Sequence, residues 1–170
     1  MRNIAIVISV FIIILGGVLY LKNLNTPKQE KTSEQAQNIS KESSESSQES
    51  KILAGKSSPF LEFNKVDYEK ALSENKIIFL DFYANWCPIC RGEAPLIVSG
   101  FNALATDKII GFRVNFKDSD TDSDEISLAK EFNIPYQHTK VILKEGKEFS
   151  RSADSWTKED FDREINKALQ

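Results

Sequence analysis

The two cysteines of the chain stand at Cys87 and Cys90, with Pro88 and Ile89 between them. They follow a continuously apolar stretch that predicts a buried strand, and the residues after them predict a helix. A thiolate at a helix N-terminus is stabilised by free backbone N–H groups and by the positive end of the helix dipole. We therefore predict that Cys87 is the exposed nucleophile and that Cys90, one helical turn later, resolves a mixed disulfide.

Other interpretations of the cysteine pair are less favourable. A structural disulfide across so short a loop would constrain the unfolded chain little. A structural zinc site needs four protein ligands, whereas the only soft ligands in the sequence are Cys87, Cys90 and a single histidine, His138. Thiol–disulfide exchange is thus the leading prediction. The alternative is a copper- or zinc-binding module in which these three residues leave one coordination position open.

Length and charge narrow the choice of function further. The chain has 170 residues and a formal net charge of −3, with lysine and arginine scattered rather than clustered. A basic patch that could bind nucleic acid is therefore not expected. The length suits one domain with attached segments.

Three zones divide the chain. Residues 1–25 contain an almost unbroken apolar run from 4 to 21, long enough to cross a membrane as a single helix. We predict an uncleaved anchor there, and a cleaved signal peptide is the alternative. Residues 26–58, rich in Ser, Glu, Lys and Gln, predict a disordered linker. Residues 59–170 predict the globular domain.

The globular zone alternates strand and helix patterns and ends in a hairpin around Glu145 and Gly146. Thr157 is expected to cap the last helix. The order predicts an α/β fold in which helices cover both faces of a mixed sheet. The expected strands are 60–63, 76–83, 109–116, 139–143 and 147–151, and the expected helices are 66–75, 88–104, 124–132 and 157 onward.

Residues 80–91, Leu-Asp-Phe-Tyr-Ala-Asn-Trp-Cys-Pro-Ile-Cys-Arg, resemble the active-site segment of thioredoxins, and the element order over 59–170 agrees. Residues 90–95, Cys-Arg-Gly-Glu-Ala-Pro, resemble the TlpA/ResA group within that superfamily. The resemblance implies a bacterial protein with a single-pass anchor in the plasma membrane and an extracytoplasmic C-terminal domain. It also implies exported protein thiols or disulfides as partners, a membrane redox partner, and no cofactor besides the redox-active cysteine pair.

The resemblance assigns roles to three more residues. Asp81 matches the buried acid that takes the proton from the resolving cysteine, and a hydrogen-bonded carboxylate at a strand end is the alternative. A carboxyl buried there should have a raised pKa, as a base working near neutrality requires. Trp86 matches the tryptophan that packs over the motif. Glu93 matches the acidic residue of the TlpA/ResA group, and a solvated helix face explains it equally well.

The sequence departs from the family at the loop facing the cysteines, where thioredoxins place a cis-proline. With an insertion of about three residues, Pro135 takes that place. Without a gap, His138 takes it, between Gln137 and Thr139, and we prefer this alignment because it fits the following strand and turn. The peptide bond before His138 is then expected to be trans. Its imidazole could stabilise the Cys87 thiolate or bind a metal, or it could be an ordinary hydrogen-bonded loop histidine.

Overall fold

A computed structural model describes residues 50–170 of the chain. The predicted anchor over residues 1–25 and residues 26–49 of the predicted linker lie outside the described residues. Within residues 50–170, no helix combines the length and the apolar character that crossing a membrane requires.

The centre of the domain is a six-stranded mixed sheet with the order β1-β2-β4-β3-β5-β6. Strand β4 pairs in parallel with β2 and β3, whereas β1, β5 and β6 join by antiparallel pairing. The central strand β3 thus lies between a parallel and an antiparallel neighbour. The strands are β1 (Ile52–Ala54), β2 (Phe60–Glu62), β3 (Ile77–Tyr83), β4 (Ile109–Asn115), β5 (Thr139–Lys144) and β6 (Lys147–Ser152).

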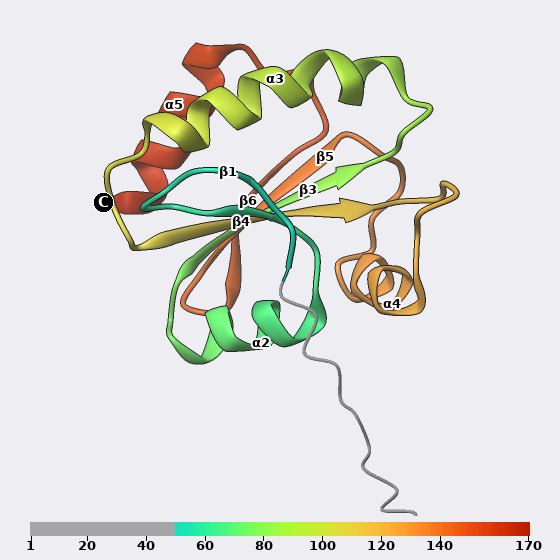
Figure 1. Ribbon diagram of the computed structural model, residues 1–170, viewed down its shortest axis with the longest axis horizontal. Helices are drawn as coiled ribbons and strands as arrows, with labels where there is room; N and C mark the ends of the chain where they lie inside the picture. Colours follow the sequence, from blue (N-terminus) through green and yellow to red (C-terminus); the bar gives the residue numbers. More distant parts are fainter. Residues whose placement is uncertain (1–49) are drawn as a thin grey trace, which may run out of the picture. The chain divides into compact units, whose positions relative to one another are not determined.

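Within the described residues, four helices enclose this sheet. Helices α3 and α5 lie over one face, and α2 and α4 lie over the other (Figure 1). This arrangement confirms the predicted α/β architecture of a mixed sheet with helices on both faces. The helices are α2 (Lys65–Ser73), α3 (Pro88–Ala103), α4 (Ser123–Glu131) and α5 (Lys158–Leu169).

Local side-chain chemistry explains where several elements begin. Asn64 caps α2, Asp122 caps α4 in a capping box, and Thr157 caps α5 as predicted. The β5–β6 turn has φ of 55° at Glu145 and 70° at Gly146. Positive φ at both central residues is what a tight two-residue hairpin requires.

The core on the α3/α5 face is aromatic. Phe79 of β3, Phe101 of α3 and Phe161 of α5 are all buried, with ring centroids 5.6 to 6.1 Å apart. Side chains alternate between the two faces of a strand, so Asp81, two residues after Phe79, belongs to this same face. Packing of α3 onto β3 thus brings the start of α3 over the carboxyl of Asp81.

The predicted linker boundary at residue 58 is wrong. Strand β1 lies inside the segment 26–58 and pairs antiparallel with β2 at the sheet edge. Ala54 is buried in the core of the α3/α5 face, and the buried hydroxyl of Ser58 donates a 2.5 Å hydrogen bond to the carbonyl of Thr106. Three apolar residues give too short a pattern to predict a strand, and β2 supplies the hydrogen bonds that this strand cannot make alone.

Candidate active site

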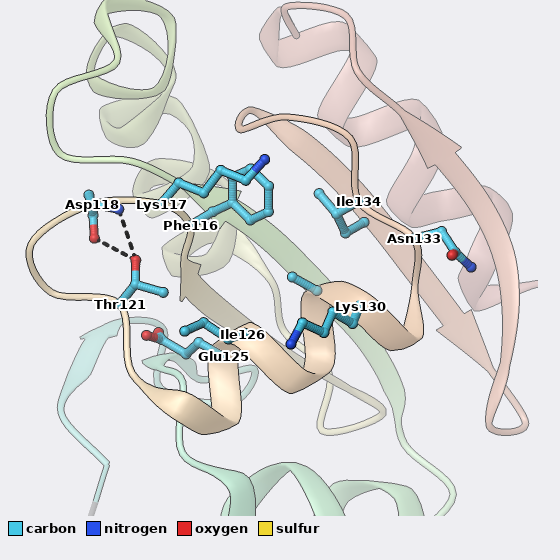
Figure 2. Close-up of a pocket in the computed structure, with 10 residues that line it drawn as sticks. Phe116, Lys117, Asp118, Thr121, Glu125, Ile126, Lys130, Asn133 and Ile134 are labelled. Carbon is cyan, nitrogen blue, oxygen red and sulfur yellow. Dashed lines mark hydrogen bonds between the residues drawn. The ribbon is translucent and has the colours of Figure 1, made fainter.

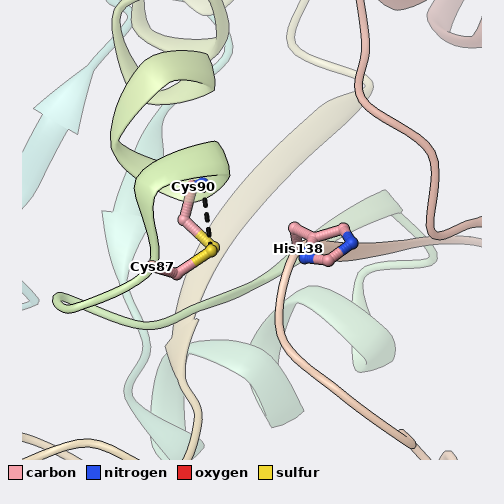
Figure 3. A group of neighbouring side chains, drawn as sticks. All are labelled: Cys87, Cys90 and His138. Atoms are coloured by element: carbon pink, nitrogen blue, oxygen red, sulfur yellow. Dashed lines mark hydrogen bonds between the residues drawn. The ribbon is translucent and has the colours of Figure 1, made fainter.

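The cysteine pair lies where the chain passes from β3 into α3, and both residues are free thiols. Cys87 is the N-cap of α3, and its Sγ accepts a 3.3 Å hydrogen bond from the backbone N–H of Cys90 (Figure 3). Pro88 occupies the first turn, where its missing N–H leaves no partner unsatisfied. The N-terminus of α3 therefore directs the backbone N–H of Cys90 at the sulfur of Cys87, as the position at a helix start predicts.

The predicted exposure of Cys87 is wrong. Cys87 is 2% exposed and Cys90 4%, so both belong to a small buried cluster with Ala84. The backbone bends at the N-cap and turns the sulfur of Cys87 inward, toward the first turn of α3. The exposed apolar side chains beside the pair are Trp86 and Ile89. They make the surface beside the buried pair apolar.

Cys90 cannot ionise easily by itself. Burial raises its pKa to about 12, and its hydrogen-bonding contact with Cys87 acts in the same direction. A thiol so far from ionising near neutrality needs a base to become a nucleophile.

Asp81 has the properties expected of that base. It is 4% exposed, and burial raises the pKa of its carboxyl from 3.8 to about 6. Lys140 and Arg113 oppose this rise because both are cations, whereas Glu93 adds to it. The raised pKa that the sequence predicts is confirmed, and the role of Asp81 as proton acceptor stays a prediction.

The loop that carries Trp86 is fastened to the loop after β4. The indole Nε1 of Trp86 donates to the carbonyl of Lys117 at 3.1 Å, and the backbone N–H of Asn85 donates to the carboxylate of Asp118 at 2.8 Å. The guanidinium of Arg91 in α3 donates to the carbonyl of Asn85 at 2.9 Å. These bonds hold the turn before Cys87 from both sides.

His138 is the residue that faces the cysteines, as in the alignment without a gap. One ligand atom each of Cys87, Cys90 and His138 lies within 4.8 Å of the other two, and Figure 3 shows the imidazole beside the sulfurs. The backbone N–H of His138 donates to the carbonyl of Phe82 at 2.7 Å, which ties the loop to β3. Every peptide bond within residues 50–170 is trans, as expected before His138. Pro135 is exposed.

The residues on either side of His138, Gln137 and Thr139, are at least half-buried. Thr139 is buried and its hydroxyl donates to the carbonyl of Tyr136 at 2.9 Å, and Gln137 is half-buried. His138 itself has φ of 56°, in the left-handed region, and its Nδ1 is buried without a hydrogen-bond partner among the described residues. On a surface loop, water would bond to such a nitrogen. The buried, unpaired Nδ1 therefore distinguishes His138 from an ordinary surface histidine.

Glu93 is not on a solvated helix face. It is 7% exposed, and its carboxylate contacts the ammonium of Lys140 at 2.6 Å and accepts from the backbone N–H of Trp156. Sequence reasoning missed Lys140, whose ammonium is fully buried. The available signal was a lysine within the predicted strand 139–143, directly before three apolar residues, where a charged side chain needs a partner.

A cavity of about 620 Å³ lies between the end of β4 and α4 (Figure 2). Phe116, Ile126 and Ile134 give it an apolar lining, and the buried carboxyl of Glu125 lies at its edge. None of the residues predicted for the active site lines this cavity. The predicted active-site residues at the start of α3 thus lie outside this cavity.

Comparison with known proteins agrees with this chemistry. The family model described as Thioredoxin matches residues 59–167. Thioredoxin H4 of Arabidopsis thaliana is 39% identical over 103 residues, covering 60% of this chain and 79% of that protein. Thioredoxin H2 of the same plant is 34% identical over 111 residues, covering 63% and 70%.

The crystal structure of thioredoxin NaTrxh from Nicotiana alata has a TM-score of 0.50 and 25% identity, covering 68% of this chain and 96% of that one. Membership of a family of disulfide exchangers favours thiol chemistry at Cys87 and Cys90 over the metal-binding alternative. Because the family match spans most of the described residues and includes the cysteine pair, the chain belongs to the thioredoxin family and is a thiol–disulfide oxidoreductase.

Proposed function

We propose that this oxidoreductase is a bacterial, single-pass plasma-membrane protein that exchanges disulfides with exported proteins on the outer side of the membrane. One observation carries the proposal: an apolar run at residues 4–21 and a polar segment precede the catalytic domain on the same chain. A domain of this size can be translocated even though Lys22, Lys28 and Lys31 follow the run, since long domains largely escape the charge rule. Residues 1–25 anchor the protein, and the polar segment lets the domain reach its substrates.

The geometry of the site supports the following exchange step. The Cys87 thiolate attacks one sulfur of a substrate disulfide, so a mixed disulfide forms and one substrate thiolate leaves. Cys90 gives its proton to Asp81, and the resulting thiolate attacks the sulfur of Cys87. The Cys87–Cys90 disulfide forms and the second substrate thiolate leaves, so the substrate gains the two electrons that the protein loses. The reverse sequence oxidises a substrate dithiol.

Membership of the TlpA/ResA group is part of the proposal. It is supported by the order Cys-Arg-Gly-Glu-Ala-Pro at residues 90–95 and by the burial of Glu93 next to the catalytic elements. A membrane redox partner returns the Cys87–Cys90 pair to its working state after each turnover, and the exchange uses no further cofactor. Nucleic acid is not among the partners, since the chain is mildly acidic.

A trapping experiment in whole cells tests the location and the substrates together. In the full chain, Cys90→Ala should accumulate mixed disulfides between Cys87 and exported proteins, because the resolving thiol is gone. The double variant Cys87→Ser/Cys90→Ala is the matched control and should trap none.

The same cells report the side of the membrane. The domain of the full chain should be cleaved by protease added outside spheroplasts, whereas a chain lacking residues 1–25 should be protected. Trapped partners that are all cytoplasmic, or a full-length domain protected from external protease, would contradict the proposal.

A further inference from the structure

Asp81 lies in a row of charged residues that crosses four strands. In the parallel pairing of β3 with β4 it is opposite Arg113, and in the antiparallel pairing of β3 with β5 it is opposite Lys140. Residues paired directly across neighbouring strands share a face, so both cations lie on the α3/α5 face with Asp81. Glu62 of β2 extends the row, since it is opposite Arg113.

The two cations differ in their other partners. Arg113 is half-buried, contacts Glu62 at 3.4 Å and lies 4.7 Å from the ring of Tyr83. Its charge is therefore shared with the carboxylate of Glu62 on β2. Lys140 is fully buried and lies opposite Asp81 in the pairing of β3 with β5, and its ammonium contacts Glu93 of α3 at 2.6 Å.

The Glu93–Lys140 pair is held in place from both ends. The ammonium of Lys140 also donates to the carbonyl of Asp154 at 3.0 Å and lies 5.6 Å from the ring of Trp156. The carboxylate of Glu93 accepts from the backbone N–H of Trp156. Removing both charges from such a buried pair is often neutral or stabilising, so stability alone gives no reason for it. Its distinctive property is its position beside Asp81.

We propose that Glu93 and Lys140 are positioning residues that set the pH at which Asp81 can accept the proton of Cys90. Lys140 favours the carboxylate form of Asp81, and Glu93 limits that effect by neutralising Lys140 and by repelling a second negative charge. The other ionisable groups near Asp81 are Arg113 on β4 and the two thiols on α3, and they remain in place when the pair is altered.

Burial raises the pKa of Asp81 to about 6, with Lys140 lowering it and Glu93 raising it. The two partners must therefore act on Asp81 in opposite directions, although they form one ion pair. Lys140→Met leaves Glu93 as an unpaired anion and removes a cation, so Asp81 should hold its proton to higher pH. Glu93→Gln leaves Lys140 free to favour the carboxylate, so Asp81 should release its proton at lower pH.

The resolving step can be measured alone on the full-length, reduced protein with an excess of Ellman's reagent. Cys87 releases one thionitrobenzoate as it forms the mixed disulfide. Cys90 then releases a second in a phase whose rate does not depend on reagent concentration. Cys90→Ala should lack this second phase. In the wild-type protein the rate of this second phase should fall at low pH, because Asp81 becomes protonated. The pH at the midpoint of that fall is the measured quantity.

We expect Lys140→Met to move this midpoint upward and Glu93→Gln to move it downward, each by about one pH unit, or roughly tenfold in rate at a fixed acidic pH. The double variant should lie between them. Lys140→Arg keeps the charge and should keep the wild-type midpoint. The matched controls are Glu125→Gln, a buried carboxyl on the other face, and Lys144→Met, at the end of the same strand. Neither should move the midpoint.

Midpoints that shift in the same direction for both single variants, or that do not shift, would overturn the proposal. Thermal unfolding of each variant separates this effect from a loss of folding, which would lower the rate at every pH without moving the midpoint. If Lys140→Met fails to fold, Glu93→Gln decides the question through its downward shift or the absence of one. The inference rests on the exchange reaction and not on the proposed location, because the rate of thionitrobenzoate release does not depend on which side of a membrane the domain lies.

Discussion

Asp81→Asn should stabilise the folded domain, and the gain should depend on pH. The carboxyl of Asp81 is buried, and its pKa in the folded protein is about 6 against an ordinary value of 3.8. As the pH rises from the lower to the higher value, the unfolded chain releases this proton first. The stability that protonated Asp81 gives is therefore complete below the unfolded pKa and is lost as pH rises through the folded pKa.

The size of the effect follows from the same two values. A difference of one pKa unit corresponds to about 1.4 kcal/mol, so a rise from 3.8 to about 6 is worth on the order of 3 kcal/mol. Asparagine has nearly the same shape as aspartic acid and carries no charge at any pH. Ionising the buried carboxyl of Asp81 lowers the free energy of unfolding of the wild-type protein, and this loss is complete above about pH 7. The variant carries no ionisable group there and should not lose this stability.

Urea unfolding of the compact unit Ser46–Gln170 over a series of pH values measures this directly. The difference in unfolding free energy between Asp81→Asn and wild type should be smallest near pH 3 and should reach a plateau above about pH 7. Asp107→Asn, at an exposed carboxyl, is the control and should show no such trend. A difference that is constant with pH, or an Asp81→Asn protein that is less stable than wild type at about pH 8, would refute the reasoning.

Three further substitutions test other parts of the site and its scaffold. A protonated imidazole favours a nearby thiolate, so His138→Ala should make the disulfide harder to reduce, by about 30 mV for a tenfold change in the equilibrium constant. Equilibration with glutathione measures this, and an unchanged potential at mildly acidic pH would contradict it. Gly111→Ala should destabilise the domain by about 1–3 kcal/mol, because the added Cβ would overlap the ring of Phe101; urea unfolding with an unchanged midpoint would show that the core can yield. Glu125→Ala should cost about 1–3 kcal/mol, because the backbone N–H of Asn115 loses its 2.7 Å acceptor and α4 loses half of its capping box. The same unfolding assay checks this, and wild-type stability would contradict it.

The elements that the sequence predicted correctly are those with a strong local pattern. The unbroken apolar residues 77–80 predicted a strand buried on both faces, and β3 is the central strand. Thr157 predicted the start of α5 because a hydroxyl before an acidic first turn is a local capping signal. The strand-to-helix position of the cysteines then fixed the chemistry, since the N-terminus of α3 needs no distant residue to face Cys87.

The features that the sequence could not predict depend on contacts between distant segments. Strand β1 forms because it pairs with the free edge of β2. Its three residues are too few to show the alternating pattern of a strand. Cys87 is buried because the bend at the N-cap turns its sulfur inward, whereas a helix pattern alone leaves an N-cap exposed. The partnership of Glu93 with Lys140 joins α3 to β5 across 47 positions of sequence, and only the packing of α3 on the sheet brings them together.

The loop before β5 is tied to β3 at His138, through a backbone group and a backbone conformation that proline does not have. The backbone N–H of His138 donates to Phe82 at 2.7 Å, and a proline has no N–H to donate. The φ of 56° at His138 is likewise closed to proline, whose ring holds φ near −65°. The backbone path is thus one that a proline could not adopt. The hydrogen bond ties this loop to the central strand β3, and His138 places an imidazole beside the two sulfurs, where a proline would offer no group that can carry charge.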